Sequence, residues 1–381
     1  MQTPTLGPHL LPNLRSFTWY AYSWDSIPFL WLFLNPGLVD VDINFPENAL
    51  NIYRPAIISL IPARDLTDLR LGTMWLADPL SMDAVYNLLE QASATLRSVD
   101  LDGDPSMAII EKLLQLPNLR HLDVRLPGTH IPPPAVVFPS LEKLIVWYGE
   151  AASWLHILRN IPNPALQELK ISFGNSSPVY FQTLGTSLLD ANIGKALVSL
   201  ECHGRIHLTE AGLHPFLSFG RLTKLHLNSP CTEERCTFQL NDSIISELAA
   251  ALPRLTSLEL GGTPCDTPTS DVTITSLVAL SNNCLNLGTL QLHFNANDII
   301  SRDTHANSQT HKFTCKLRTL TVGSQPLPTN HDDILLVAFA ILQIFPHLET
   351  IFTKSHDWDQ VGRAVHLFQK ARKTIPSPTT D

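Results

Sequence analysis

The chain has 381 residues, of which 44% are hydrophobic and 16% are charged, so its composition supports a large folded core and argues against a disordered chain. Its 26 basic and 35 acidic residues give a formal net charge of −9, which disfavours the basic surface that nucleic-acid backbones require. The longest apolar run, residues 27–34, falls well short of the roughly 20 residues of a membrane-spanning helix. We therefore expect a globular protein with neither a nucleic-acid partner nor a membrane segment.

The N-terminal residues lack the charged start, apolar block and small-residue cleavage site of a secretory signal. This pattern favours a cytoplasmic or nuclear location. The 6 cysteines are too sparse for a disulfide framework, so we expect them to be reduced. We also expect the chain to be a monomer.

One six-residue phrase recurs along the chain, with apolar residues at positions 1, 4 and 6 and polar residues between them. The thirteen copies begin at Leu14, Leu38, Leu66, Leu96, Leu119, Leu141, Leu166, Leu197, Leu222, Leu255, Leu287, Leu317 and Leu348. Alternation of apolar and polar residues is typical of a strand with one buried face. Each copy therefore predicts a strand.

Several segments between these phrases carry apolar residues at helical spacing. The expected helices are residues 82–92, 107–116, 154–161, 244–252, 274–281 and 334–345. Many of them end in Leu-Pro-x-Leu, as in LPNL at 116–119, where proline stops the helix and the next strand begins. One strand and one helix cannot bury their own apolar faces, so the repeats must stack into an α/β solenoid with a continuous core.

These copies resemble the leucine-rich repeat family, which has an L-x-x-L-x-L core and a repeat of about 20–29 residues. The resemblance covers residues 11–353. Copies such as 208–227 and 280–292 look like the helix-bearing repeats of F-box proteins, and the opening LPNLRSFTW and closing SHDWDQVGRAVHLFQKAR resemble fungal F-box/leucine-rich-repeat proteins. The resemblance implies a curved solenoid with parallel strands on the concave face, helices on the convex face, and a protein partner.

The domain organisation follows from the repeat pattern. We expect a lead-in over residues 1–13, a solenoid of about 13 repeats over 14–354, a C-terminal capping helix over 355–373 and a loose tail over 374–381. Three segments interrupt the pattern and predict surface loops: 127–134, 228–241 and 295–316. The last is either a contact or a disordered segment, and its polar composition favours disorder.

The F-box/leucine-rich-repeat proteins that this chain resembles carry a short helical F-box domain ahead of the repeats, and this domain docks to a ubiquitin-ligase scaffold. No LPxEIL-like phrase occurs in the sequence. Either the chain is part of a longer product or the F-box has been lost. A ubiquitin-ligase scaffold is therefore expected as a partner only if an F-box precedes Met1.

Sequence motifs of enzymes are missing from the chain. It contains no G-x-S-x-G, H-E-x-x-H or G-x-G-x-x-G, and Gly194-Lys195 is followed by alanine without an upstream phosphate loop. We expect no catalytic residue, no cofactor and no enzyme activity. A zinc site at His226, Cys231 and Cys236 lacks a second matching pair, so loop thiols beside an exposed histidine are the favoured interpretation and no metal is expected.

The polar positions 3 and 5 of each phrase, with the residue that follows at position 7, should project onto the concave face. The residues predicted to bind a partner there are Asp42, Arg70, Asp100, Asp102, Asp123, Arg125, Lys143, Trp147 and Lys170. The first strands are acidic, and Trp147 then stands as an exposed aromatic among cations. Aromatic and arginine side chains dominate binding hot spots, so Trp147 is the sharpest candidate. In the alternative interpretation these charges only solvate a sheet, or the 127–134 loop shields Trp147.

Three functional hypotheses follow, in descending order of support from the residues. The first is a protein-interaction scaffold that binds a partner with a basic segment and an apolar anchor. The second, a special case of the first, is the substrate-recognition part of an F-box-type ubiquitin-ligase subunit. The third is an enzyme. Coding sequence upstream of Met1 would separate a ligase subunit from an adaptor that has lost its F-box.

Overall fold

The computed structural model describes residues 10–20, 29–45, 53–72, 78–125, 140–147, 158, 165–173, 180–204, 206, 208–228, 238–261, 270–297, 299, 314–323, 327, 330–353 and 355–374. The chain divides into two compact units. Unit 1 comprises Met1–Gly174 and Asp190–Ile193, and unit 2 comprises Asn175–Leu189 and Gly194–Asp381.

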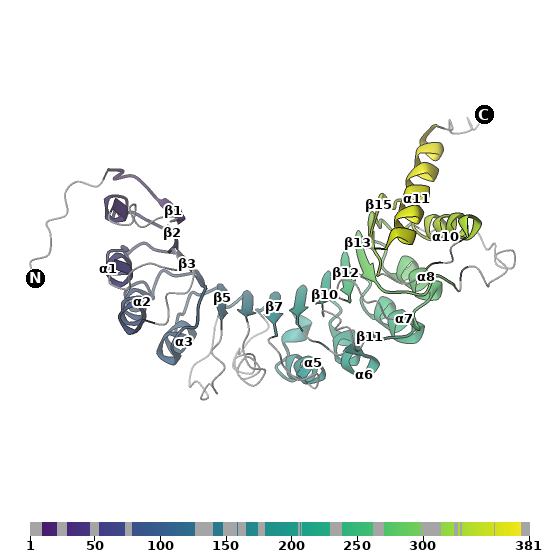
Figure 1. Ribbon diagram of the computed structural model, residues 1–381. Helices are drawn as coiled ribbons and strands as arrows, with labels where there is room; N and C mark the ends of the chain where they lie inside the picture. Colours follow the sequence, from purple (N-terminus) through teal and green to yellow (C-terminus); the bar gives the residue numbers. More distant parts are fainter. Residues whose placement is uncertain are drawn as a thin grey trace, which may run out of the picture. The chain divides into compact units, whose positions relative to one another are not determined.

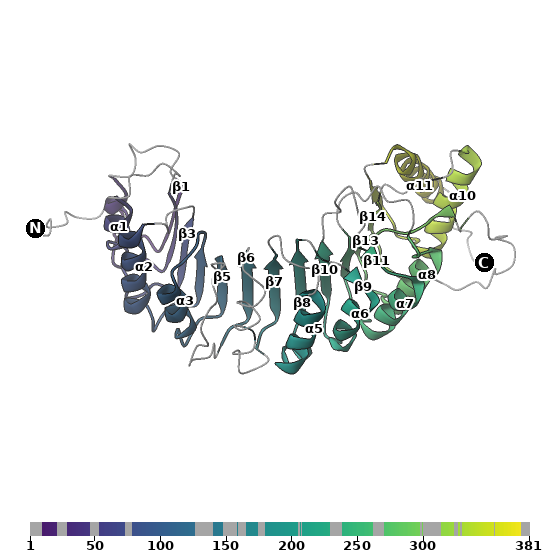
Figure 2. The same ribbon diagram turned by 60° about the horizontal axis from the view of Figure 1, so that its bottom comes forward.

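Unit 1 is built on parallel strands that pair in chain order (Figure 1). They are β1 (Ser16–Tyr20), β2 (Asp40–Asn44), β3 (Asp68–Gly72), β4 (Ser98–Leu101), β5 (His121–Arg125), β6 (Lys143–Trp147) and β7 (Glu168–Ser172). The helices α1 (Tyr53–Ile58), α2 (Pro79–Gln91) and α3 (Met107–Leu114) cover one face of these strands (Figure 2). We call the opposite face, on which the described residues place no helix, the open face.

Unit 2 repeats this arrangement. Its parallel strands are β8 (Ser199–His203), β10 (Lys224–Asn228), β12 (Ser257–Leu260), β13 (Thr289–Leu292), β14 (Thr319–Thr321) and β15 (Thr350–Phe352), and β9 (Leu208–Thr209) pairs separately with β11 (Phe238–Gln239). Its helical elements are α5 (Tyr180–Asp190), η3 (Ile193–Lys195), α6 (Glu210–Leu213), η4 (His214–Ser218), α7 (Asp242–Ala251), α8 (Ile274–Asn283), α10 (His331–Ile344) and α11 (His356–Thr374), of which α5 and η3 each run across the boundary between the units. As in unit 1, we call the face of these strands that is turned away from the helices the open face of unit 2.

Each repeated phrase forms one strand, and every one of these strands begins at position 3 of its phrase. The leucine at position 1 is fully buried in every copy from Leu38 to Leu348, whereas Leu14, in the first copy, is only partly buried. The predicted fold class is confirmed: parallel strands lie on one side, helices lie on the other, and the phrase leucines fill the space between them. The fold is a leucine-rich-repeat solenoid.

Helices α2, α7 and α10 begin earlier than their apolar spacing indicates, whereas α3 and α8 begin at the expected residues. Helix α2 begins at Pro79 rather than at residue 82, because the Asp78 carboxylate accepts hydrogen bonds from the backbone N–H groups of Leu80 and Ser81. Asn330 caps α10 in the same way, so that helix begins at His331 rather than at 334. The first turn of α10 is polar and α2 begins with a proline, so an apolar pattern does not find these two starts.

Helix α5 is absent from the sequence-based expectation, because its segment contains glycine, threonine and serine. Gly185 is required by packing: a Cβ atom there would lie 2.7 Å from Pro215 Cβ and 3.0 Å from Phe216 Cε2 of η4. The missing side chain lets the two elements approach closely. The expected helix at 154–161 lies outside the described residues apart from Leu158.

Helix α11 packs against α10 and β15 at the C-terminal end of unit 2. It is anchored in the core by Trp358, which is 1% exposed and meets Phe294 edge-to-face with ring centroids 5.4 Å apart. The helix begins at His356, so Asp357 lies in its first turn. No helix among the described residues is long and apolar enough to cross a membrane.

The three expected loops are only partly described. Residues 127–134 lie outside the described residues, as do all but a few residues at the two ends of 295–316. Within 228–241, Phe238 and Gln239 form β11 and Asn241 caps α7 by accepting a hydrogen bond from the Ile244 N–H. That end of the expected loop is therefore structured.

Candidate protein-binding face

The parallel register of unit 1 lines up one side chain from each strand on the open face. The row at position 5 runs Thr18, Asp42, Arg70, Asp100, Asp123, Ile145 and Lys170. Neighbouring strands are about 4.8 Å apart, so adjacent members of the row are close enough to interact directly.

Arg70 joins the two carboxylates beside it. Its Nη1 lies 3.3 Å from Asp42 Oδ2, and its Nε lies 2.9 Å from Asp100 Oδ2. Asp42 is only 8% exposed, and the Tyr20 hydroxyl also donates to its Oδ2. The structure places Asp42, one of the residues predicted to bind a partner, in contact with Arg70 and Tyr20, where its carboxylate holds the arginine in position.

Asp100 and Asp123 are direct register neighbours, so two carboxylates face each other across β4 and β5. Burial raises the pKa of Asp123 to about 6, and the nearby charge of Asp100 adds to that shift, while hydrogen bonding to Trp147 and the charges of Lys170 and Arg70 oppose it. Burial also raises the pKa of Asp100 in spite of Arg70. Within the described residues Asp123 forms no ion pair, so this part of the face carries excess negative charge.

Trp147 is fixed from two sides. Its Nε1 donates a hydrogen bond of 2.6 Å to Asp123 Oδ1, and Lys170 Nζ lies 5.2 Å from the centroid of its ring. The sequence predicts an exposed side chain at this position, whereas the structure shows a half-buried one. The indole is thus held in one orientation before any partner arrives.

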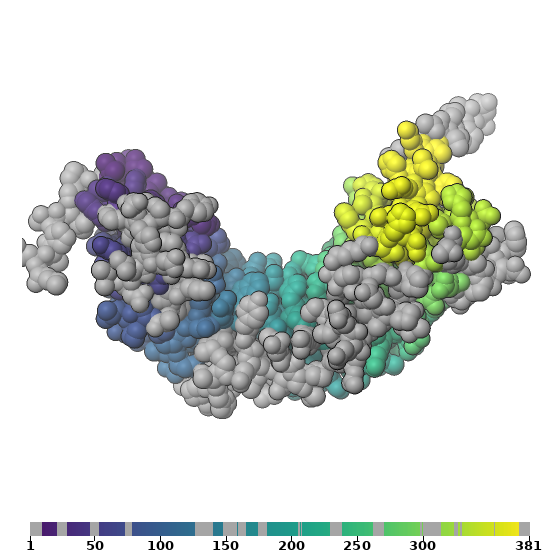
Figure 3. All heavy atoms as spheres, in the orientation of Figure 1, coloured from purple at the N-terminus to yellow at the C-terminus, as the bar shows by residue number. Residues whose placement is uncertain are grey.

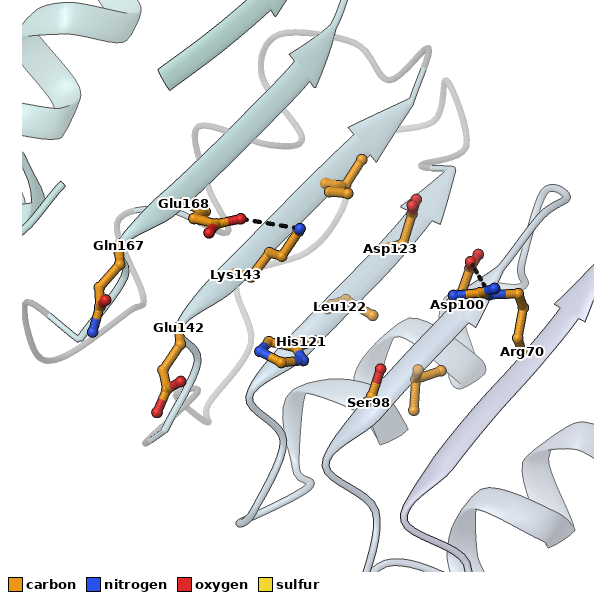
Figure 4. A pocket seen from close by; sticks show the side chains of 12 residues that line it. Arg70, Ser98, Asp100, His121, Leu122, Asp123, Glu142, Lys143, Gln167 and Glu168 are labelled. Atoms are coloured by element: carbon orange, nitrogen blue, oxygen red, sulfur yellow. Dashed lines mark ion pairs between the residues drawn. The ribbon is translucent and has the colours of Figure 1, made fainter. Parts of the chain in front are cut away.

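A hollow of about 400 Å³ opens on this face between β3 and β7 (Figure 4). The side chains that line it include Arg70, Ser98, Asp100, His121, Asp123, Glu142, Lys143, Gln167 and Glu168. Figure 4 shows the Arg70–Asp100 pair at one side and the Lys143–Glu168 pair, with 3.0 Å between Nζ and Oε2, at the other, with Asp123 between them. The hollow therefore has an acidic centre between two ion pairs.

The structure brings most of the predicted residues together. Arg70, Asp100, Asp123 and Lys143 line the hollow, and Trp147 and Lys170 reach it through Asp123. Arg125 lies next to Trp147 in register, with its Nη2 3.8 Å from Asp102 Oδ1 and its Nε 3.9 Å from Asp104 Oδ1.

Sequence reasoning missed several residues of this face. Glu142 and Gln167 occupy position 2, just ahead of their strands, and the prediction considered only positions 3, 5 and 7. Asp104 follows β4 in a segment that the repeat pattern does not specify, whereas His121, at position 3, lies where the pattern places open-face residues. The polar residue that most phrases carry at position 2 was the signal available for Glu142 and Gln167.

On the open face of unit 2, the prediction that His226 is exposed is wrong. His226 is 8% exposed; its Nε2 lies 2.7 Å from Ser257 Oγ and its Nδ1 lies 3.4 Å from Glu259 Oε2. Burial lowers the pKa of His226, although the charge of Glu259 opposes this. Cys231 and Cys236 lie outside the described residues.

The described cysteines are free and buried: Cys202, Cys284 and Cys315. Burial raises the pKa of each thiol, to about 12 for Cys284. In the part of the chain that the structure describes, no group of three or more His, Cys, Asp or Glu side chains is arranged to hold a metal ion.

No protein-family model matches the chain, and no curated protein matches it. Among solved structures, the chain is similar to a chain of the crystal structure of the yeast Rad7 and Elc1 complex. The two share 17% sequence identity with a TM-score of 0.51, and the match covers 82% of this chain and 77% of that chain. At this identity the likeness concerns the fold alone, and it agrees with the leucine-rich-repeat solenoid.

Proposed function

We propose that this chain is a protein-interaction module whose partner binds the open face of unit 1. The observation that carries the proposal is the Trp147 indole, held between Asp123 and Lys170 at the edge of an acidic hollow. A preoriented aromatic side chain loses little entropy on binding, which suits an anchor. The similar structure is itself a complex of two proteins, Rad7 and Elc1, which supports a binding role for this fold.

The charge of the face suggests the kind of partner. Strands β2 to β5 present Asp40, Asp42, Asp68, Asp100, Asp102 and Asp123 against Arg70 and Arg125 at positions 3, 5 and 7. Arg70 illustrates how a cation sits between carboxylates of adjacent strands, whereas the described residues place no such cation between Asp100 and Asp123. A partner with a basic segment and an apolar side chain for Trp147 would complement this surface.

The finer proposal is that the chain is the substrate-recognition part of an F-box-type ubiquitin-ligase subunit of fungal type, working in the cytoplasm or nucleus. The resemblance of its repeats to those proteins supports it. The alternative is an adaptor or scaffold that works without an F-box. In both cases the chain acts by binding, as a monomer and without catalysis.

Affinity purification with matched baits tests the binding proposal. We expect the wild-type chain and a Phe352→Ala variant to recover the same partner, because Phe352 is an exposed aromatic on the open face of unit 2. Trp147→Ala should lose it. Equal recovery by all three baits would place the partner elsewhere.

The ligase proposal needs a separate measurement. The product of the complete gene should bind a purified ubiquitin-ligase scaffold and direct ubiquitin onto the recovered partner. If the partner binds through Trp147 but the scaffold does not bind, the adaptor alternative replaces the ligase subunit and the binding face is retained.

A further inference from the structure

A second exposed surface lies at the C-terminal end of unit 2, on α10 and α11. Phe339 is 52% exposed and Leu336, one turn before it on the same helix face, is 43% exposed. On α11, Leu367 is 64% exposed and Phe368 is 37% exposed. The rings of Phe339 and Phe368 meet edge-to-face with centroids 6.4 Å apart, so the two helices contribute to one apolar ridge.

The last turns of α11 stand away from the body of unit 2. Trp358, Val361, Ala364 and Val365 are buried, but most residues from His366 to Arg372 are exposed and none is buried. Figure 3 shows α11 in yellow protruding beside the green surface of α10. A helix end that projects into water would ordinarily carry polar side chains; Phe368 packs on Phe339, but the fold does not explain why Leu367 is exposed there.

The charge of this helix end is opposite to that of the chain. After Asp359, α11 contains no acidic residue, and Arg363, Lys370 and Arg372 are all exposed. The chain as a whole has a net charge of −9. The helix dipole accounts for cations in the last turn, but it does not account for apolar side chains among them.

We propose that this surface, defined by Leu336, Phe339, Arg363, Leu367, Phe368, Lys370 and Arg372 and called the α10–α11 surface, docks an acidic amphipathic helix of a partner protein. The leucines and the aromatic ridge receive the apolar face of that helix. The three cations receive the carboxylates on its flanks. In recognition of an amphipathic helix, apolar anchors at helical spacing supply affinity and flanking charges supply specificity.

Two other occupants fit less well. An extended anionic membrane meets the chain as a whole, whose net charge of −9 opposes its approach, whereas a single acidic helix contacts only the cationic end of α11. A second copy paired about Leu367 would bring the three cations of each molecule together around one apolar centre, which like-charge repulsion opposes.

The probe for this proposal is a synthetic amphipathic helical peptide of about 18 residues, with leucines on one face and glutamates on the flanks. Fluorescence anisotropy with the full chain measures its binding. We expect Leu367→Ser and the double variant Lys370→Glu with Arg372→Glu each to weaken that binding by at least about tenfold. Leu285→Ser, which changes another exposed leucine of unit 2, should leave it unaltered.

A second peptide with lysine in place of each glutamate isolates the role of charge, and it should bind at least about tenfold more weakly than the glutamate peptide, because its flanks meet the three cations with like charge. Trp147→Ala should not affect the glutamate peptide, so this result is independent of the function proposed for unit 1. The proposal is overturned if the glutamate peptide does not bind, or if Leu367→Ser leaves its binding intact. It is also overturned if Leu367→Ser instead abolishes binding to phosphatidylserine vesicles, or dimerisation in the ultracentrifuge.

Discussion

The open faces of the two units share one backbone pattern but satisfy their polar side chains differently. In unit 2 several polar residues of neighbouring strands are paired within the face: Lys224 forms an ion pair with Glu201, His226 lies between Ser257 and Glu259, and Gln291 donates to the Gly261 carbonyl. Asn228 also donates to Glu259, with 3.0 Å between Nδ2 and Oε2. Glu201 and Glu259 therefore each have a positive or donating neighbour.

In unit 1 the position-5 row places Asp123 beside Asp100, and the hydrogen bond to Asp123 comes from the neutral Trp147 indole. Burial raises the pKa of Asp123 to about 6, so keeping this carboxylate ionised in the folded state costs free energy. The two faces therefore differ in whether carboxylates of neighbouring strands lie beside each other, as Asp100 and Asp123 do. A face whose polar side chains pair with one another only keeps the sheet hydrated. A face with an uncompensated buried carboxylate beside a fixed aromatic ring is better suited to bind a partner.

The largest expected effect separates a structural tryptophan from a surface one. Trp358→Ala in unit 2 should lower the free energy of unfolding by about 3–5 kcal/mol, because it removes a fully buried ring packed on Phe294. Trp147→Ala in unit 1 should cost about 1 kcal/mol or less, because its ring is half-buried on an open face. Urea denaturation of both variants measures the difference, and equal losses would mean that Trp147 is a core residue.

A smaller effect is expected at Arg70. Replacing it with methionine leaves the buried Asp42 and the partly buried Asp100 without their cation, and should cost about 1–2 kcal/mol after allowance for the solvent exposure of the arginine. Arg120→Met is the matched control, because its ion pair with Glu142 is solvent-exposed and should contribute little. If both variants unfold at the same urea concentration, Arg70 does not organise the acidic row.

The two faces should respond to acid in opposite directions. The raised pKa of Asp123 means that the folded state binds its proton more readily than the unfolded state does. Its contribution to stability is full below the ordinary pKa near 4 and is lost as the pH rises through about 6. His226 has a lowered pKa, so its contribution is full above its ordinary pKa of 6.5 and is lost as the pH falls.

Hydrogen exchange between about pH 7 and about pH 5 separates these responses. Strands β4 to β6 should become more protected on acidification, and β8 to β12 less protected, after correction for the intrinsic rates. Asp123→Asn should reduce the first change, leaving the part that comes from Asp100, and add about 1 kcal/mol of stability near neutral pH, and His226→Gln should abolish the second. Changes of the same sign in both units would contradict this difference between the faces.

The sequence determined the strands of this fold far better than it determined the contacts of the face. The leucines of the phrase repeat at fixed positions and have one outcome, burial, so each phrase located a strand correctly. Residues such as Asp42 and His226 also occupy predicted open-face positions, but both are buried by neighbours that lie 28 and 31 residues away in the chain, Arg70 and Ser257. The pairing of acidic with basic side chains depends on their geometry between neighbouring strands, and this geometry cannot be predicted from a periodic pattern.

The smallest effect concerns the rate of association with a partner. Asp102 is exposed, with Arg125 Nη2 3.8 Å from its Oδ1, so Asp102→Lys should slow association several-fold at low salt, with the difference vanishing at high salt. Asp100 is unsuitable for this test because it holds Arg70. Asp65→Lys, an exposed acid that precedes β3, is the control for charge alone. Stopped-flow measurements with the purified partner would show whether the acidic strands steer its approach.

The most direct test of the binding face is titration calorimetry of the purified partner against the wild-type chain, Trp147→Ala and Phe352→Ala. The two variants each remove one aromatic side chain from an open face, the first in unit 1 and the second in unit 2. We expect Trp147→Ala to weaken binding by about 2 kcal/mol, or about 30-fold, and Phe352→Ala to leave it unchanged. Unchanged affinity for Trp147→Ala, or an equal loss for both variants, would contradict the assignment of the partner site to unit 1.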